Sequence, residues 1–326
     1  MERIFCIYCK QTIEVGPNDE QICPNCVKEL QIPHAELFNG VFVLENEFKI
    51  LNLLQDILKD KIVFKHLNKL TANEFDINED HSVTYLKINC NHIEILPGYL
   101  SLLTNLQELK IISRSLYHIA DNFKPPKLRE LSLFSCKFKI FPPAIFECSE
   151  LTNLWISGSE IKEIPDEIAN LRKLLSLKLN NNRIQTITEN ITDLHDLSIL
   201  DLGCNQLRKL PTVLFELENL TILKLHVNYL EKIPRALIKL INLQILEIYC
   251  NHLLSLPPLP SSIEYLDISS NFQLELSEDF VEFENLKSLN IAGNNKIDKE
   301  ILRKKVHESA LITKLNSLEQ PVFFLK

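Results

Sequence analysis

Four cysteines near the N-terminus have the residue type and spacing of a metal site. Cys6 and Cys9 form one C-x2-C pair, and Cys23 and Cys26 form a second. Each pair can place two thiolates on one side of a tight turn, and two such turns make a tetrahedral cage of four sulfurs. A cage closed by four protein ligands leaves no open position, so we expect a structural site. We predict one Zn²⁺ ion, with iron as the alternative because four thiolates suit both metals.

The segment that carries these cysteines is expected to fold around the metal. About 35 residues cannot bury enough apolar surface to fold alone, so metal binding would supply the folding free energy. The Gly16-Pro17-Asn18-Asp19 stretch between the two pairs predicts the turn that brings them together. The segment resembles a zinc ribbon, and its iron alternative resembles a rubredoxin site. Such ribbons contact protein or nucleic acid, and the excess of acidic over basic residues here favours protein.

From Val83 to about Asn295 the chain consists of repeats, most of them 23 residues long. Four consecutive units read LTNLWISGSEIKEIPDEIANLRK, LLSLKLNNNRIQTITENITDLHD, LSILDLGCNQLRKLPTVLFELEN and LTILKLHVNYLEKIPRALIKLIN. A fixed period with L-x-x-L-x-L-x-x-N is the pattern of leucine-rich repeats. The units resemble the 23-residue class of Ras-suppressor-type proteins and of many bacterial leucine-rich repeat proteins.

This resemblance implies an α/β solenoid, a leucine-rich repeat horseshoe with a parallel β-sheet on its concave face and short helices or 3-10 turns on its convex face. We expect four regions: a zinc-ribbon-like lobe at 1–35, an N-terminal helical cap at 36–82, about ten repeats at 83–297, and a C-terminal helical cap and tail at 298–326. Caps are needed because a solenoid exposes an apolar face at each end. Apolar residues at helical spacing predict a capping helix over 45–60.

Two positions in each repeat determine how the chain turns. The ninth residue is Asn in most repeats, and its amide can bond backbone groups that the turn would otherwise bury unpaired. We predict this role for Asn91, Asn182, Asn205, Asn228, Asn251, Asn271 and Asn294. Arg114, Cys136 and Ser159 take the same position in three successive repeats. A proline after the fourteenth residue should open the convex turn.

Candidate partner-binding residues follow from the alternation of side chains along a strand. The fourth and sixth residues of a repeat should point into the core, and the third, fifth and seventh should point out. Trp155 is the sharpest candidate, because tryptophan is frequent at interface hot spots. The candidates are Lys87, Lys110, Phe134, Trp155, Lys178, Ile199, Asp201, Ile222, Lys224, His226, Ile245, Glu247, Tyr249, Tyr265 and Asp267. The alternative is that the β-branched residues only support one another in the sheet and that Trp155 packs on Phe134 and Lys178.

Composition narrows the class of function. A net charge of −8 disfavours attraction to nucleic acid or anionic lipid. No apolar run reaches the ~18 residues of a membrane span, and the first residues contain no secretory signal. The remaining cysteines Cys90, Cys136, Cys148, Cys204 and Cys250 are expected to be free thiols in a reducing, cytoplasmic compartment. Signal-independent export to another cell's cytosol would leave the same sequence features.

These features favour a monomeric, non-enzymatic scaffold that binds a protein or peptide on its concave face. One alternative is a nucleic-acid-associated module that uses the zinc ribbon. Another is a bacterial effector-type binding protein without a catalytic domain, because NHLLSLPPLPSSIEYLDISSN resembles the repeats of secreted effector ligases. The ligase activity is not implied, since no cysteine follows Asn295. We find no nucleophile elbow, phosphate-binding glycine loop or histidine-bearing metal motif.

Elemental analysis of the purified chain tests the metal site. We expect one zinc ion per chain, and we expect replacement of Cys23 and Cys26 by Ser to abolish zinc binding because two of four ligands are lost. Replacement of Cys148 by Ser is the matched control and should leave the zinc content unchanged. An iron-coloured protein would favour the rubredoxin-like alternative, and a metal-free protein whose N-terminal lobe stays folded would contradict both.

Overall fold

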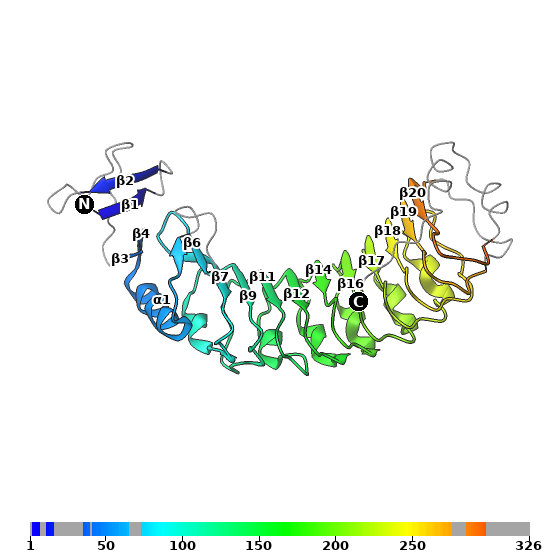
Figure 1. Cartoon of the computed structure of the whole chain (residues 1–326), viewed down its shortest axis with the longest axis horizontal. Helices are drawn as coiled ribbons and strands as arrows, with labels where there is room; N and C mark the ends of the chain where they lie inside the picture. Colours follow the sequence, from blue (N-terminus) through cyan, green and yellow to red (C-terminus); the bar gives the residue numbers. More distant parts are fainter. Residues whose placement is uncertain are drawn as a thin grey trace. The chain divides into compact units, whose positions relative to one another are not determined.

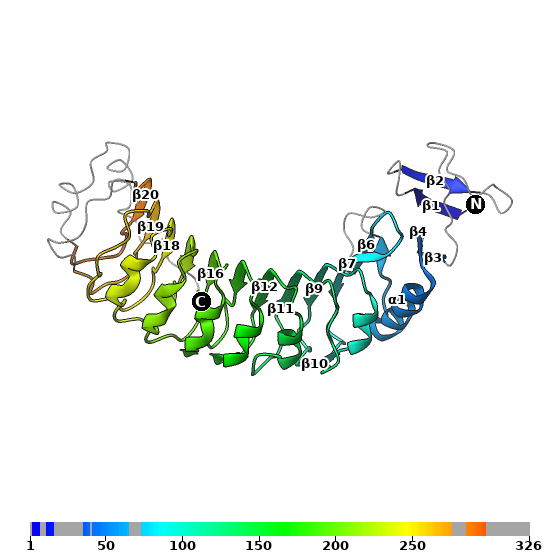
Figure 2. The same ribbon diagram turned by 180° about the vertical axis from the view of Figure 1, so that it is seen from behind.

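The computed structural model describes residues 2–6, 11–15, 35–39, 41–64, 73–275 and 285–297. The chain forms two compact units. The first unit is Met1–Phe138 with Pro142–Leu151, and the second is Lys139–Phe141 with Thr152–Lys326. Within each unit, the main strands lie along one side and short 3-10 helices lie along the opposite side (Figures 1 and 2).

The N-terminal segment contains two antiparallel strand pairs. β1 (Glu2–Cys6) pairs with β2 (Gln11–Val15), and β3 (Ala35–Phe38) pairs with β4 (Val41–Leu44). Of the four predicted metal ligands, Cys6 ends β1, where only the backbone is described. Cys9, Cys23 and Cys26 lie outside the described residues, as do residues 298–326. The zinc site and the C-terminal cap therefore stay predictions.

The capping helix is α1 (Glu45–Leu58), close to the predicted range of 45–60. It buries Ile50, Leu51, Leu54 and Leu58, which share one face of a 3.6-residue period. The helix ends at Lys59, whose backbone is left-handed with a φ of 53°. Glu47 is also buried, and its carboxylate accepts a hydrogen bond of 2.7 Å from the backbone N–H of Val83. This bond ties the helix to the first repeat strand.

The sheet of the first unit is partly antiparallel. Its strands, in hydrogen-bonded order, are β5 (Val63–Phe64), β6 (Glu74–Ile77), β7 (Val83–Asn89), β9 (Glu108–Ile112) and β11 (Glu130–Phe134). β7, β9 and β11 are parallel, whereas β6 runs antiparallel to β7. The region predicted as a helical cap thus also supplies strands. These strands pair the backbone groups that the edge of β7 would otherwise leave open.

The sheet of the second unit is parallel throughout. Its strands are β12 (Asn153–Ser157), β14 (Ser176–Lys178), β16 (Ile199–Asp201), β17 (Ile222–Lys224), β18 (Ile245–Glu247), β19 (Tyr265–Asp267) and β20 (Ser288–Asn290). Neighbouring strands pair in register, so equivalent repeat positions lie side by side. The fourth-position leucines Leu177, Leu200 and Leu223 are all 0% exposed. The predicted repeat register is confirmed here.

The opposite side of each unit is formed by 3-10 helices, as predicted. They are η1 (Gly98–Leu102), η2 (Pro143–Glu147), η3 (Asp166–Asn170), η4 (Glu189–Asp193), η5 (Thr212–Glu216) and η6 (Arg235–Lys239). Proline precedes all of these helices except η4, where the Thr188 side chain accepts a bond from the Asn190 N–H.

The repeat pattern did not predict two short parallel strand pairs. β8 (Ile95–Leu96) pairs with β10 (His118–Ile119), and β13 (Glu163–Ile164) pairs with β15 (Thr186–Ile187). Of these strands, β8, β13 and β15 lie just before η1, η3 and η4.

Buried asparagines join successive repeats in the second unit. The Nδ2 of Asn205 donates to the carbonyl of Leu202 at 3.1 Å and to that of Leu179, in the preceding repeat, at 2.9 Å. Its Oδ1 accepts from the N–H of Ile184 at 2.9 Å. Asn228 and Asn251 repeat this arrangement one and two repeats further on. The ninth-position amides thus satisfy backbone groups of two repeats at once, as predicted.

Asn91 differs from these asparagines: its side chain is exposed, although its Oδ1 still accepts a hydrogen bond of 2.8 Å from the backbone N–H of Arg114 in the next repeat. In the third to tenth repeats the eighth residue has a left-handed backbone, as at Cys204 with a φ of 55° and Val227 with a φ of 53°. That turn aims the ninth residue inward. The first two repeats lack the turn, so their eighth residues, Cys90 and Ser113, are the buried ones. Ser113 Oγ donates to the Ile93 carbonyl at 3.2 Å and takes over the role of the amide.

The buried Glu47 predicts a pH dependence of stability. Burial raises the pKa of this carboxyl from 4.5 to about 7, against the bond from Val83, which lowers it. The folded state therefore favours the neutral acid. The resulting stabilisation is fully present below pH 4.5 and is lost as the pH rises through about 7.

We expect Glu47→Gln to remove this pH dependence and to raise the free energy of unfolding at pH 8 by ~1–2 kcal/mol. Urea unfolding at pH 5 and pH 8 measures it. The exposed Asp56, on the same helix, supplies the control Asp56→Asn, which should leave the dependence in place. Equal pH profiles for Glu47→Gln and the unmodified chain would contradict the prediction.

Candidate functional site

The candidate site is the outer face of the second-unit sheet, defined as the third, fifth and seventh positions of its repeats. Ile199, Ile222, Ile245 and Tyr265 occupy the third position of four successive strands and are direct register partners. Each is partly exposed, whereas the leucine that follows it is at most 1% exposed. The four side chains therefore form one continuous apolar stripe, and strand alternation is the reason.

Trp155 lies on β12 of the same sheet and is 36% exposed. Its Nε1 donates to Asn180 Oδ1 at 2.9 Å, and Lys178 Nζ lies 4.9 Å from the ring centroid. These two contacts fix the orientation of the indole while leaving part of its surface accessible. A side chain held in this way loses little further entropy on binding. Asn180 was not among the predicted residues, although its seventh position in the repeat marks it as outward-facing.

The charged residues along the fifth position largely satisfy one another. Lys224 Nζ lies 2.9 Å from Glu247 Oε1. Asp267 accepts bonds from Ser269 Oγ at 2.6 Å and from Asn290 Nδ2 at 2.9 Å. These partners belong to the chain itself. The charged groups of this row therefore hold the surface side chains in place and are less available to pair with charges on a partner. The apolar stripe and Trp155 are then the stronger candidates for contact with a partner.

His226 and Tyr249 form an aromatic pair at the seventh position. Their rings are stacked, with centroids 4.6 Å apart and an interplanar angle of 8°. Burial lowers the pKa of His226 below its usual 6.5, so the ring is neutral at pH 7. Its Nδ1 lies 3.5 Å from Glu247 Oε2 without a well-aligned hydrogen bond. The ring covers Gly203, where a Cβ would lie 2.3 Å from His226 Cε1, so a side chain at this position would displace the histidine.

Lys87, Lys110 and Phe134 belong to the first unit. Lys87 Nζ makes an ion pair with Glu74 at 2.9 Å, and Lys110 Nζ lies 5.3 Å from the Phe134 ring centroid. All the other partner-binding candidates belong to the second unit. Most of the predicted partner-binding residues therefore lie on the outer face of the second unit.

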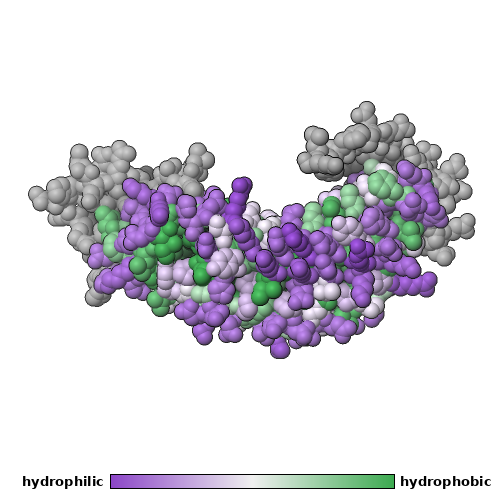
Figure 3. Space-filling model, turned by 60° about the horizontal axis from the view of Figure 1, so that its bottom comes forward, coloured by the Kyte–Doolittle hydropathy of each residue, from purple (hydrophilic) through white to green (hydrophobic). Residues whose placement is uncertain are grey.

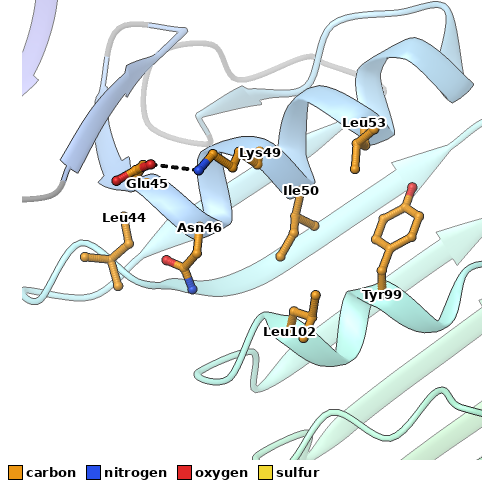
Figure 4. Close-up of a pocket in the computed structure, with 8 residues that line it drawn as sticks. All are labelled: Leu44, Glu45, Asn46, Lys49, Ile50, Leu53, Tyr99 and Leu102. Carbon is orange, nitrogen blue, oxygen red and sulfur yellow. Dashed lines mark hydrogen bonds and ion pairs between the residues drawn. The ribbon is translucent and has the colours of Figure 1, made fainter.

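The first unit contains an apolar groove between α1 and η1. It has a volume of about 580 Å³, and Figure 4 shows Ile50 and Leu53 on α1 facing Tyr99 and Leu102 on η1. Leu53 is 52% exposed and Leu102 is 58% exposed. Hydrophobic side chains also gather over the N-terminal part of this unit, at the left of Figure 3. The Tyr99 hydroxyl is buried with no hydrogen-bond partner among the described residues.

The five cysteines of the repeats, Cys90, Cys136, Cys148, Cys204 and Cys250, are free, as predicted. Burial raises the pKa of both Cys136 and Cys148 to about 12, so these thiols are poor nucleophiles. No cluster of three or more histidine, cysteine or acidic residues able to hold a metal occurs in the part of the chain that the structure describes. Nor does that part contain a helix long and apolar enough to span a membrane.

Comparison with known proteins supports the leucine-rich repeat class. Residues 149–207 and 195–253 match the family model described as leucine rich repeat. No curated protein matches the chain. Together with the repeat geometry, the match supports assignment of the array to a leucine-rich repeat family.

Several solved structures share the fold. A plant ice-binding protein is 20% identical over 80% of this chain and 92% of its own, with a TM-score of 0.58. The ectodomain of the Arabidopsis thaliana receptor kinase GASSHO1/SCHENGEN3, in complex with CASPARIAN STRIP INTEGRITY FACTOR 2, is 23% identical over 74% of this chain, with a TM-score of 0.51. The PEPR1-AtPEP1 structure is 23% identical over 68% of this chain, with a TM-score of 0.52. The match spans only 33% of each of these two chains, and such identities establish the fold alone.

Two adjacent residues of β17 test the assignment of the outer face. Leu223→Ala should lower the free energy of unfolding by ~2–5 kcal/mol, because it opens a cavity in the core. Ile222→Asp should lower it by only about 0.5–1 kcal/mol, because that side chain points out of the sheet. Chemical unfolding of both variants measures the difference. If Ile222→Asp unfolds the chain while Leu223→Ala is tolerated, the register is wrong.

Proposed function

We propose that this chain is a protein-interaction scaffold that binds an extended segment of a protein or peptide on the outer face of the second unit. The observation that carries this proposal is the partly exposed Trp155, held by Asn180 and Lys178 on the same face as the apolar stripe. Tryptophan and tyrosine are enriched among the residues that dominate binding energy. A pre-oriented indole beside continuous apolar side chains is the arrangement expected of an interface core.

The dimensions of the face suit an extended partner. Parallel strands lie ~4.8 Å apart, so the stripe from Ile199 to Tyr265 spans ~15 Å. That length matches four or five residues of extended chain, which rise ~3.3 Å per residue. The receptor ectodomain described above was solved in complex with CASPARIAN STRIP INTEGRITY FACTOR 2, which illustrates that the fold can carry a ligand. For the present chain, this comparison supports the proposal only at the level of the fold.

The charges favour a protein over nucleic acid as the partner. The chain has a net charge of −8, and its fifth-position row includes Asp201, Glu247 and Asp267. Lys224, within that row, is already paired with Glu247. A phosphate backbone would therefore meet repulsion on this face.

The proposal includes no catalysis. The histidine of the face, His226, is stacked on Tyr249, and burial raises the pKa of the thiol of the preceding repeat, Cys204. A neutral thiol beside a packed imidazole is not an activated nucleophile. We propose that the chain acts as a monomer in a reducing, cytoplasmic compartment, where its free thiols persist. The zinc-ribbon-like lobe would serve as a structural N-terminal element.

Affinity capture from a lysate of the source cells, with quantitative mass spectrometry, tests the proposal. The intact chain should retain a defined set of proteins, and Trp155→Ala and Ile222→Asp should each reduce their recovery. The expected loss is ~2 kcal/mol in binding, or roughly 30-fold, if either residue is a hot spot. Ile241, which is 68% exposed and lies outside the outer face, supplies the matched control Ile241→Asp.

The result is interpretable only when the variants have the melting temperature of the intact chain. Equal recovery by the folded Trp155→Ala, Ile222→Asp and Ile241→Asp variants would exclude the outer face as the site. Recovery of RNA in place of protein, weakened steeply by salt, would favour the nucleic-acid alternative.

A further inference from the structure

A second polar site lies on the flank of the second unit, beyond the strands and the buried asparagines. It is a pocket of about 780 Å³. Three successive repeats contribute its lining, which consists of Gln185, Thr186, Gln206, Arg208, Lys209 and Tyr229. These residues occupy the tenth, twelfth and thirteenth positions of their repeats, and none belongs to the outer face. The pocket is therefore a separate feature of the unit.

Two cations on one repeat line this pocket without an acidic partner. Arg208 and Lys209 are exposed, and neither makes an ion pair with any other described residue. By contrast, Arg183 on the preceding repeat lies 2.9 Å from Glu160. Two adjacent unpaired cations are notable in a chain whose net charge is −8. They leave a local positive charge that a ligand can neutralise.

The guanidinium of Arg208 is held in place by aromatic contacts. Its Cζ lies 5.5 Å from the centroid of the Tyr229 ring, which in turn lies 5.8 Å from the ring of His252. A guanidinium over a ring keeps its N–H groups free at its edge, where they can bind an oxyanion in a fork-like geometry. Tyr229 thus acts as the support of the arginine.

The neutral side chains of the pocket add donors to the same site. Gln185 Nε2 donates to Gln206 Oε1 at 3.0 Å, which orders both amides. This bond uses the oxygen of Gln206 and leaves its Nε2 available to donate. Thr186 contributes a hydroxyl. The nearest acidic positions in the repeat pattern are Glu163, the register partner of Thr186, and Glu231, one repeat after Arg208. Neither residue lines the pocket.

We propose that this flank pocket binds a phosphate monoester through Arg208 and Lys209, with Gln206 and Thr186 donating to the remaining oxygens. A phosphate monoester carries a charge of about −1.5 to −2 at pH 7 and three acceptor oxygens, which two cations and two neutral donors match better than a carboxylate does. The volume exceeds that of the phosphate group alone, so the pocket has room for the group that carries it. The phosphate can belong to a phosphorylated side chain or to a free phosphorylated metabolite.

Isothermal titration of the full chain tests this site with three ligands: inorganic phosphate, free phosphoserine, and a glycine-rich peptide with one phosphoserine. The same peptide without phosphate is the reference. We expect the phosphorylated peptide to bind at least about 10-fold more tightly than the reference, because charge-assisted hydrogen bonds form only with the phosphate. Tighter binding of the peptide than of free phosphoserine would indicate a protein source, and the reverse would indicate a metabolite.

Three variants locate the interaction. Arg208→Ala and Lys209→Ala should each weaken binding of the phosphorylated ligand by about 10-fold. Lys232→Ala is the matched control, because Lys232 holds the same repeat position as Lys209 one repeat later and does not line the pocket. It should change affinity less than about 2-fold, as should Trp155→Ala on the outer face. Circular dichroism should show the same melting temperature for all four variants.

Two results would overturn the inference. One is equal affinity for the phosphorylated and unphosphorylated peptides. The other is a loss in Arg208→Ala no greater than that in Lys232→Ala. Because the pocket and the outer face share no residue, failure of this test leaves the proposed protein-binding function standing. Loss of partner capture in Trp155→Ala with phosphate binding intact would likewise separate the two sites.

Discussion

The hydrogen bonds of the buried asparagines are the interaction on which the second unit depends. Each repeat must leave its strand in a tight turn, and that turn buries backbone carbonyls and N–H groups which would destabilise the fold if unpaired. Asn205 satisfies such groups in its own repeat and in the preceding one. Because the side chain spans two repeats, it fixes their spacing as well as the turn. Strand register, and with it the direction of every side chain in the sheet, follows from this constraint.

The candidate site is a consequence of that register. Equivalent repeat positions lie side by side, and side chains alternate along each strand. This alternation places Ile199 and Ile222 on the outer face, and it places Leu200 and Leu223, which follow them, in the core. Trp155 gains its fixed orientation from Asn180 and Lys178, both on the next repeat. The ring of His226 fits against residue 203 because that residue is glycine and has no Cβ. The proposed binding surface therefore depends on local features of a few repeats.

The sequence predicts the repeated parts of this structure well. Leucine spacing sets the strands, proline marks the 3-10 turns, and apolar periodicity gives the capping helix nearly to its ends. The exposure of Asn91 was not predicted, because the left-handed turn at the eighth residue has no reliable residue signal and even Val227 adopts it. The strands β5 and β6 were missed because they are too short for a periodic pattern and form only by pairing with the sheet. The contact of Trp155 with Asn180 and the flank pocket at Arg208 join residues of different repeats, which spacing within one repeat does not reveal. The four-cysteine lobe lies largely outside the described residues and stays a prediction.

The claim that the outer face of the second unit is the binding surface is tested most directly by site-specific photo-crosslinking in the source cells. A photo-reactive phenylalanine analogue would replace Trp155 on the outer face in one chain and Ile238, which is 50% exposed on η6, in another. The account predicts a covalent adduct with a discrete protein from position 155 and none from position 238. An adduct that forms from position 238 but not from position 155, with both chains folded, would contradict it.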